Sequence, residues 1–395
     1  MILSDVTAPE PDAILKLMRA FAEDPRPHKI DLGVGVYRDA AGETPVMGAV
    51  KTAERQLWES ERSKSYTALS GDPAFLEALR GLTLGAAVPE ARVAGAATPG
   101  GTGAVRQALD LVRMAAPETT VWLSDPTWPN HVSILAAIGQ PSRRYRYLDA
   151  ATGALDRAGL REDLGRARPG DAIVLHGCCH NPTGVDLGPE EWRWVAELCA
   201  ERGVLPIVDL AYQGFGDGLE ADVAGLRRLA AAVPELVLCV SGSKTFGLYR
   251  DRVGAVLAVA ETAAARERVA ARLAGLNRQA YAFPPDHGAR LVTMILADAT
   301  LRAAWDDELA RMRSRIAAMR RALTDALRAE TGSDRFDFLA DQRGLFSLLG
   351  ASRAEMDRLR EEQALYAVQD GRINVAGLTP DTAGPAARAI AAVLG

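Results

Sequence analysis

Short apolar runs alternate with stretches of helical periodicity through the middle of this chain, and this alternation constrains the fold more than any other feature. Between residues 93 and 259 the apolar runs have the length and the flanking turn residues of buried strands. The predicted strands are 119–124, 143–148, 172–176, 204–210, 235–240 and 253–259. Helical stretches separate them at 103–115, 128–138, 189–202 and 222–232. The pattern predicts an α/β fold with a mostly parallel sheet, in which ligands gather at the carboxyl ends of the strands.

A lysine follows one of these predicted strands. Lys244 lies in Ser241-Gly-Ser-Lys-Thr-Phe-Gly-Leu-Tyr-Arg-Asp-Arg252, directly after the apolar run 235–240. Burial and nearby cations both lower the pKa of a lysine, and such a lysine can act as a nucleophile and form a Schiff base. Most lysines are instead solvated on the surface. Lys244 therefore becomes a candidate nucleophile only in combination with the other segments.

A glycine-rich turn opens one of the predicted helices. In Thr98-Pro-Gly-Gly-Thr-Gly-Ala-Val-Arg106 the glycines allow backbone N–H groups to approach an anion at a helix N-terminus. The turn is not a dinucleotide-binding fingerprint, because Arg106 stands where a third glycine is required. Gly242-Ser-Lys-Thr245 likewise lacks the glycine that precedes the lysine of a Walker A loop. The turn is either a phosphate site of another kind or a plain glycine turn.

Three further strand ends carry side chains that suit a planar or charged ligand. Trp128 stands among turn residues, where it either stacks on a ligand or caps the core. Asn181 precedes a Pro-Thr-Gly turn and is either a ligand contact or a turn residue. Asp209 interrupts an apolar strand, and a buried carboxylate needs either a structural arginine or a cationic ligand beside it.

Composition excludes several classes of protein. The chain has 395 residues, of which 48% are hydrophobic and 25% charged, and its formal net charge is −5. This mild acidity argues against nucleic acid as the main partner, and no apolar run has the length of a transmembrane helix. The start of the sequence lacks the basic region and the apolar core of a signal peptide. We therefore expect a cytoplasmic protein that binds neither nucleic acid nor membrane.

The four cysteines predict neither a disulfide framework nor a metal site. Cys178 and Cys179 are adjacent in the sequence, and no Cys-x-x-Cys pair occurs. His176 and His180 lie beside them, but adjacent cysteines are poorly placed to ligate a structural zinc ion. We expect no metal in this protein.

The chain becomes mainly helical after about residue 285. The stretch 301–330 is rich in alanine, arginine and leucine and has an apolar stripe, which predicts a long helix that bridges two parts of the protein. The segment 351–362 predicts another amphipathic helix, and 372–375 predicts a short strand. These elements indicate a smaller α+β part after the large sheet.

Taken together and in this order, the segments resemble one family along nearly the whole chain. The resemblance also includes the segments 30–37, 42–46, 64–66, 344–347 and 371–381. The chain is similar to the pyridoxal-phosphate aminotransferases of fold type I, in the aspartate and aromatic amino acid aminotransferase branch. The cofactor implied is pyridoxal 5′-phosphate. The domains expected are a large cofactor-binding domain over 45–310 and a small domain built from 1–44 and 311–395.

The resemblance implies a role for each candidate around the cofactor. Lys244 would form the aldimine and then carry the proton between the substrate α-carbon and the cofactor's C4′ carbon. Asp209 would keep the pyridine nitrogen protonated, and Trp128 would stack on the ring. Asn181 and Tyr212 would hydrogen-bond the ring's 3′ oxygen. The implied phosphate ligands are Gly101, Thr102, Ser241, Ser243, Arg252 and, from the neighbouring subunit, Tyr66.

The resemblance also implies a substrate site shared between the subunits of a homodimer. Arg372 would bind the substrate α-carboxylate, and Arg278 would bind a second carboxylate across the dimer. An ordinary surface position is the alternative for each arginine. The chain departs from the family at Ala282-Phe283, where two small polar residues usually stand, and an aromatic ring there favours aromatic or aliphatic substrates. The other implied substrate contacts are Gly35, Trp128 and Asn181.

The function implied is transfer of an amino group between an aromatic amino acid, or aspartate, and 2-oxoglutarate in ping-pong half-reactions. One alternative is a lyase or decarboxylase with the same cofactor site, which would not need Arg278. Another alternative is a non-catalytic relative that binds the cofactor for regulation. Such regulators usually carry an N-terminal DNA-binding domain, whereas here the resemblance begins near residue 30.

Overall fold

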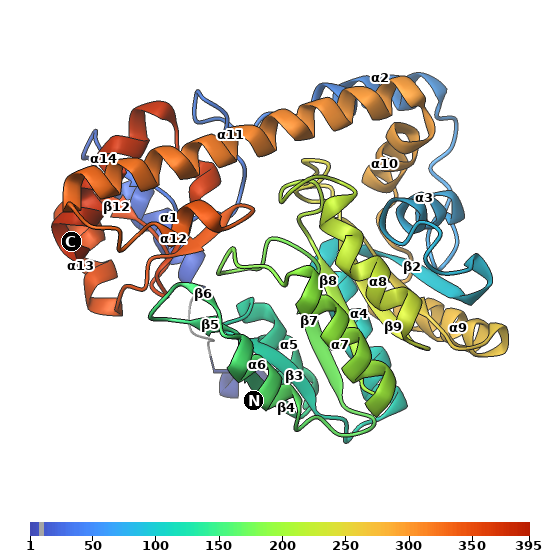
Figure 1. Cartoon of the computed structure of the whole chain (residues 1–395). Helices are drawn as coiled ribbons and strands as arrows, with labels where there is room; N and C mark the ends of the chain where they lie inside the picture. Colours follow the sequence, from blue (N-terminus) through green and yellow to red (C-terminus); the bar gives the residue numbers. More distant parts are fainter. Residues whose placement is uncertain (8–11) are drawn as a thin grey trace.

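A seven-stranded sheet lies at the centre of the computed structural model, which describes residues 1–7 and 12–395 (Figure 1). The strand order is β2-β10-β9-β8-β7-β3-β4, and only β10 runs antiparallel to its neighbours. The predicted α/β fold with a mostly parallel sheet is confirmed. The strands are β2 (Val93–Pro99), β3 (Val121–Asp125), β4 (Ser142–Arg146), β7 (Ala172–His176), β8 (Leu205–Leu210), β9 (Leu236–Ser241) and β10 (Val253–Val259).

Two details of the sheet differ from the sequence prediction. The predicted strand 143–148 is divided, because β5 (Leu148–Asp149) leaves the sheet and pairs with β6 (Ala154–Leu155). Strand β2 was not among the predicted strands, since its sequence consists mainly of small residues with low strand propensity. Its small side chains face α4 (Gly100–Ala115) and α9 (Ala263–Ala280) on one side and α3 (Pro73–Thr83) on the other, so both helical layers pack close to this edge.

Helices cover both faces of the sheet. On one face lie α4 (Gly100–Ala115), α5 (Pro129–Ile138) and α9 (Ala263–Ala280), which pack on strand side chains such as Val174 and Val237. On the other face, side chains such as Ile173 and Leu238 pack against a second set of helices. Successive strand residues thus alternate between two apolar layers, as the pleat of a strand requires. The second set is α3 (Pro73–Thr83), α6 (Arg157–Leu164), α7 (Pro189–Arg202) and α8 (Ala224–Ala232).

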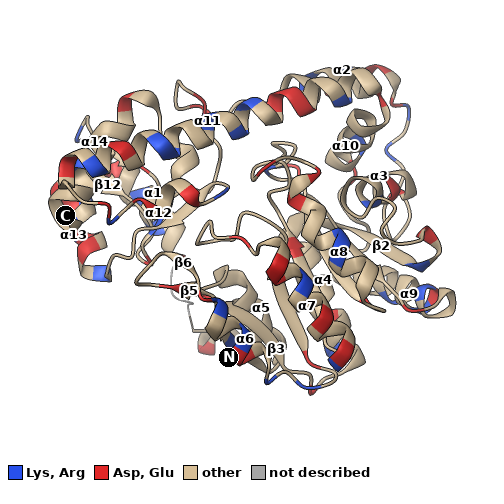
Figure 2. Ribbon diagram, viewed as in Figure 1, with Lys and Arg blue, Asp and Glu red and all other residues tan. Residues whose placement is uncertain are grey.

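One long helix connects the sheet region with the C-terminal part of the chain. Helix α11 (Ala299–Thr331) begins beside α2 (Gly48–Ser60) and α10 (His287–Ala297), and its other end packs on α14 (Pro380–Leu394) (Figure 1). Asp298 caps its first turn, and Gly332 ends it in the left-handed conformation. Basic and acidic residues are interspersed along it (Figure 2). The long helix predicted at 301–330 is confirmed.

The N-terminal and C-terminal segments of the chain pair with one another. Strand β1 (Ile30–Asp31) runs parallel to β12 (Leu365–Tyr366), and β11 (Phe346–Leu348) pairs antiparallel with β13 (Arg372–Asn374). The division into domains at residues 44 and 310 stays a prediction. The helices of this region are α1 (Ala13–Glu23), α12 (Phe338–Asp341) and α13 (Arg353–Gln363). Elsewhere and here, short 3₁₀ helices of the described chain span Ile2–Asp5, Glu90–Arg92, Ala221–Val223 and Val375–Gly377.

Candidate active site

A cavity of about 270 Å³ lies at the carboxyl ends of the central strands. Its walls come from the ends of β7, β8 and β9, the start of α4, the loop after β3, and the segments around β11 and β13. This is the edge of the sheet where a parallel fold is expected to bind its ligand. All of the predicted site residues except Tyr66 and Arg278 line it: Gly35, Gly101, Thr102, Trp128, Asn181, Asp209, Tyr212, Ser241, Ser243, Lys244, Arg252 and Arg372.

Lys244 presents its amine to this cavity from the loop that follows β9. The Nζ atom lies 4.8 Å from the centroid of the Tyr212 ring. Burial lowers the pKa of Lys244 to about 8; Asp209 opposes this shift, whereas the cations Arg252 and Arg372 add to it. An appreciable fraction of the amine is therefore neutral near pH 7, as a nucleophile or general base requires.

Asp209 lies near the end of β8, where it is buried with an exposed fraction of 9%. His131 Nε2 donates a hydrogen bond of 3.0 Å to its Oδ2 atom. Burial raises the pKa of Asp209, but this hydrogen bond and the nearby charges outweigh burial and leave the pKa below its usual value. The structure thus holds an ionised carboxylate at the floor of the cavity.

The protein group beside Asp209 is a histidine. The sequence predicts either a structural arginine or a cationic ligand beside this carboxylate. His131 of α5 stands in the place of the arginine, and the cationic ligand stays a prediction. The second ring nitrogen of His131 pairs with the Thr127 hydroxyl at 2.9 Å, which fixes the orientation of the imidazole. One feature of the sequence could have indicated His131 as a site residue. It lies three residues after Trp128 in the same strand-end segment, in the first turn of the helix.

The glycine-rich turn and Arg252 form a cradle for an anion. Helix α4 begins at Gly100, and its N-cap residue makes no side-chain hydrogen bond, so the first N–H groups of the helix stay available. A Cβ atom on Gly100 would lie 2.4 Å from Arg252 Nη2, and one on Gly101 would lie 2.7 Å from Ser241 Cβ. Only glycine permits this approach of the helix start to Arg252 and β9. The donors available are those of a phosphate site.

Arg372 and Asn181 form the opposite side of the cavity. Arg372 comes from β13 and is buried, with an exposed fraction of 6%. Its Nη1 atom donates to Asn181 Oδ1 at 3.3 Å, and its Cζ atom lies 4.5 Å from the centroid of the Phe346 ring. Its Nε–H is buried without a hydrogen-bond partner. A buried guanidinium with an unpaired donor is suited to bind a carboxylate that enters the cavity.

Tyr66 and Arg278 lie outside this cavity, and both are exposed. The Tyr66 ring is 83% exposed and stacks on Phe283 with a centroid distance of 4.5 Å and an interplanar angle of 15°. Arg278 lies in the last turn of α9. Neither residue can serve the cavity of its own chain in this arrangement, so their predicted roles require a second subunit.

Several residues that line the cavity were not predicted. His176 ends β7, and the strand-end rule that selected Asn181 could have selected it too. Phe346 stands within the segment 344–347, which carries part of the family resemblance, but the sequence predicts no site role for it. Ile14 reaches the cavity from α1, and its sequence neighbourhood carries no signal of this. The remaining unpredicted lining residues are Cys178, Ala211 and Tyr249.

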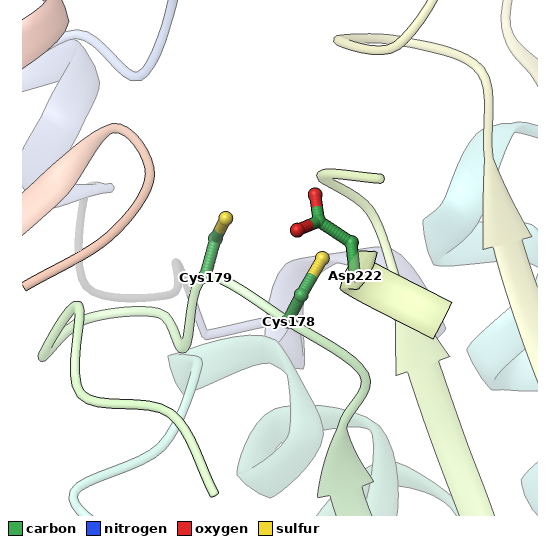
Figure 3. Close-up of side chains that lie close together, drawn as sticks. All are labelled: Cys178, Cys179 and Asp222. Carbon is green, nitrogen blue, oxygen red and sulfur yellow. The ribbon is translucent and has the colours of Figure 1, made fainter. Parts of the chain in front are cut away.

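A group of possible metal ligands lies beside the cavity, formed by Cys178, Cys179 and Asp222 (Figure 3). Their ligand atoms lie within 4.8 Å of one another. A hydrogen bond with Cys179 raises the pKa of the Cys178 thiol well above its usual value. Burial raises the pKa of the Cys179 thiol to about 12, so both thiols are neutral at pH 7. The Asp222 oxygens accept four backbone N–H bonds, from Gly214, Gly216, Asp217 and Gly218. These bonds give Asp222 a role in folding the 214–218 loop.

Comparison with known proteins agrees with this geometry. Residues 27–390 match the family described as aminotransferase class I and II. The aromatic-amino-acid aminotransferase of Paracoccus denitrificans is 50% identical over 389 residues, which cover 98% of this chain and 99% of that protein. The aspartate aminotransferase of Escherichia coli K12 is 44% identical over 396 residues, which cover both proteins completely.

Solved structures give the same result. An aromatic amino acid aminotransferase with 3-indolebutyric acid superposes with a TM-score of 0.97 and is 50% identical, with complete coverage of both chains. The aromatic-amino-acid aminotransferase from Burkholderia pseudomallei, covalently bound to pyridoxal phosphate, superposes with a TM-score of 0.96 at 41% identity, again over both complete chains. The fold type I architecture predicted from the resemblance is thereby confirmed, and this chain belongs to the class I and II aminotransferases.

Proposed function

We propose that this protein moves an amino group between an aromatic amino acid, or aspartate, and 2-oxoglutarate. The reaction type follows from the family and from its full-length relatives, which are aminotransferases of aromatic amino acids and of aspartate, and one solved relative is covalently bound to pyridoxal phosphate. The observation that carries the assignment of residues is their convergence. A lysine with a pKa of about 8, a buried carboxylate, an anion cradle and a buried arginine share one cavity. These groups match the needs of transamination.

The residues of the cavity fit pyridoxal phosphate. The cradle of Gly101, Thr102, Ser241, Ser243 and Arg252 would hold the phosphate, because it combines a helix N-terminus with a guanidinium. Trp128 and the ionised Asp209 would hold the ring and its nitrogen, and Asn181 and Tyr212 its 3′ oxygen. When bound, the cofactor supplies the electron sink that makes the substrate α-carbon acidic.

Proton transfer falls to Lys244. Its neutral amine would accept the proton from the substrate α-carbon, and Nζ would then carry that proton to the C4′ carbon of the cofactor. The Tyr212 ring lies 4.8 Å below Nζ and limits the positions that the amine can take. Asp209 stays ionised because His131 donates to it, so it can bind a protonated nitrogen throughout the reaction.

Two carboxylate sites would select the substrate. Arg372 would bind the α-carboxylate through the Nε–H that has no partner in the protein. Arg278 of the partner subunit would bind the distal carboxylate of aspartate, glutamate or 2-oxoglutarate. Phe283 lies five residues after Arg278 and would bring an apolar wall to the same side, which suits aromatic side chains. Both substrate classes would thereby share one site.

A composite site requires a homodimer, and the exposed apolar side chains support one. Trp58 and Tyr66, eight residues apart, are 80% and 83% exposed. Aromatic side chains such as these are enriched at the interfaces between protein chains. We propose that a second copy of the chain covers the segment 58–66 and receives Tyr66 and Arg278 in its cavity.

We also propose a cytoplasmic location. Cys178, Cys179, Cys199 and Cys239 are all unpaired thiols, which suits a reducing compartment. Among the described residues, no helix combines the length and the apolar character needed to cross a membrane.

An assay of amino donors tests the proposed function. The holoenzyme is incubated with aromatic amino acids, aspartate and aliphatic amino acids, each with 2-oxoglutarate, and both glutamate and the new 2-oxo acid are measured. Transamination predicts equal amounts of the two products and, without the acceptor, no more than one equivalent of 2-oxo acid per active site. A lyase or decarboxylase would form product without 2-oxoglutarate, and a non-catalytic relative would form none. Either outcome would refute the proposal.

A further inference from the structure

A buried arginine that does not line the cavity lies behind one of its walls. Arg320 projects from α11 and is only 3% exposed. Its Nη1 atom donates to the Leu339 carbonyl at 3.2 Å and to the Ser347 hydroxyl, and its Nη2 atom donates to the carbonyls of Gly344, at 2.7 Å, and Phe346, at 3.3 Å. Its partners are thus backbone carbonyls and a hydroxyl instead of a carboxylate. Burying a guanidinium in this way is costly unless its hydrogen bonds serve a structural or functional need.

The segment that Arg320 holds, 344–347, packs against the loop that carries Asn181. Gly344 has a φ of +74°, and a Cβ atom there would lie 2.3 Å from Cys179 Cβ. Next to it, the Arg343 N–H donates to the Gly184 carbonyl at 2.8 Å. The segment therefore has little freedom to shift without moving the 179–184 loop.

The same segment carries Phe346 into the cavity. The Phe346 ring lies 4.5 Å from Arg372 Cζ and makes an edge contact with Tyr212, with a centroid distance of 6.0 Å. A Cβ atom on Gly35 would lie 2.9 Å from the tip of this ring. Phe346 thus supports the arginine that is assigned to the substrate α-carboxylate, and the backbone of Phe346 is one of the groups that Arg320 holds.

We propose that Arg320 is a positioning residue for substrate binding, which acts on Arg372 through the 344–347 backbone and the Phe346 ring. The proposal rests on the assignment of Arg372 to the substrate carboxylate. Four hydrogen bonds from one planar group hold the backbone on both sides of Phe346, and one of them goes to the Phe346 carbonyl itself. The Phe346 ring in turn packs against the Arg372 guanidinium, whose Nη1 and Nη2 atoms donate to Asn181 and to the Gly33 carbonyl while Nε–H keeps no partner. Loss of this support loosens the carboxylate site and leaves the phosphate cradle around Gly101 and Arg252 unchanged, because none of these contacts reaches the cradle.

The test compares three substitutions in the holoenzyme. Arg320→Met removes the donors, Arg320→Lys keeps a charge with fewer fixed donors, and Ser347→Ala removes one acceptor with little change in volume. Arg315→Met is the matched control, because Arg315 lies on the same helix and donates to the carbonyls of Asp39 and Leu378, which do not line the cavity. The kinetic measurements are KM and kcat with an aromatic donor. The binding measurements are the amount of bound cofactor and the dissociation constant of 3-phenylpropionate, which has the carboxylate of a substrate but no amino group.

We expect Arg320→Met to raise KM and the dissociation constant of 3-phenylpropionate about tenfold or more, with kcat within about threefold and full cofactor content. Arg320→Lys should recover part of the loss, and Ser347→Ala should shift both constants in the same direction by a smaller factor. Arg315→Met should change neither constant, whatever its effect on Tm. If Arg320→Met does not yield folded protein, Arg320→Lys and Ser347→Ala decide the question.

A double-mutant cycle identifies the route. If Arg320 acts through Phe346, then Arg320→Met should weaken 3-phenylpropionate binding much less in a Phe346→Leu background than in the native one. The proposal is wrong if the folded Arg320 and Ser347 variants bind 3-phenylpropionate as tightly as the native enzyme. It is also wrong if the Arg320 and Phe346 effects multiply independently, or if kcat and cofactor content fall while binding of the carboxylate is unchanged. The last result would place the role of Arg320 at the cofactor. A separate variant, Arg372→Met, tests the proposed function: if it binds 3-phenylpropionate as tightly as the native enzyme, Arg372 is not the carboxylate site.

Discussion

The protonation of Lys244 responds to two neighbours in opposite directions, and this gives the most discriminating prediction. Its pKa is lowered to about 8, chiefly by burial; Arg252 and Arg372 contribute to this lowering, and the charge of Asp209 opposes it. Asp209→Asn removes an anion and should lower the pKa of Lys244. Arg372→Met removes a cation and should raise the pKa. Because both substitutions remove a charge at the same cavity, a general loosening of the fold would not produce opposite shifts.

The magnitude follows from the fraction of neutral amine. With a pKa of about 8, roughly 10% of Lys244 is neutral at pH 7, whereas an ordinary lysine with a pKa of about 10.5 would be roughly 0.03% neutral, a difference of about 300-fold. The rate at which the amine reacts should rise about tenfold per pH unit below pH 8 and level off above it.

The assay is pulse labelling of the cofactor-free protein with acetic anhydride over a range of pH, with the Lys244 peptide quantified by mass spectrometry. Exposed lysines such as Lys51 serve as the internal reference within the same samples. The labelling midpoint of Lys244 should lie near pH 8, move down in Asp209→Asn and move up in Arg372→Met. A native midpoint near that of the exposed lysines, or shifts of the same sign in both variants, would refute the reasoning.

Three further predictions concern the cofactor and the substrate. Asp209→Asn should lower cofactor affinity and turnover together, because the pyridine nitrogen loses its anionic partner; unchanged catalysis would show that the His131 pairing is purely structural. Arg278→Ala should lower kcat/KM for aspartate and glutamate by about a hundredfold or more, because an unpaired buried carboxylate costs on the order of 2–5 kcal/mol. The kcat/KM for phenylalanine and tyrosine should fall much less, and equal losses for both classes of substrate would show that Arg278 is structural. Mixing Lys244→Ala chains with Arg278→Ala chains should restore one competent site per hybrid dimer for dicarboxylic substrates, and absence of rescue after subunit exchange would argue against a composite site.

Much of the fold could be predicted because the sheet is buried on both faces. Strands of this kind are continuous apolar runs such as 172–176 and 253–259, and these two were placed with their exact ends. The small residues of β2 carry no such signal, and only packing against neighbouring helices makes this segment a strand. The divided strand at 143–148 depends on where the chain turns away toward β6, which the apolar pattern does not record.

The candidate site could be predicted where its residues interrupt or follow a strand. Asp209 and Lys244 were selected in this way, and the roles of Tyr66 and Arg278 came from resemblance to the family alone. His131 was missed as the partner of Asp209, because the two residues meet only when α5 packs across the end of β8. Phe346 and Arg320 were missed for the same reason, since their contacts depend on how α11 and β11 are brought together.

The covalent attachment of the cofactor tests the central claim most directly. The purified holoenzyme is reduced with borohydride, digested and mapped, and the same procedure is applied to Lys244→Ala. We expect the reduced pyridoxal phosphate label on Lys244 and no label in Lys244→Ala, whose turnover should fall by orders of magnitude because the proton carrier is lost. A label on any other lysine, or appreciable turnover in Lys244→Ala, would show that Lys244 neither binds the cofactor nor carries the proton.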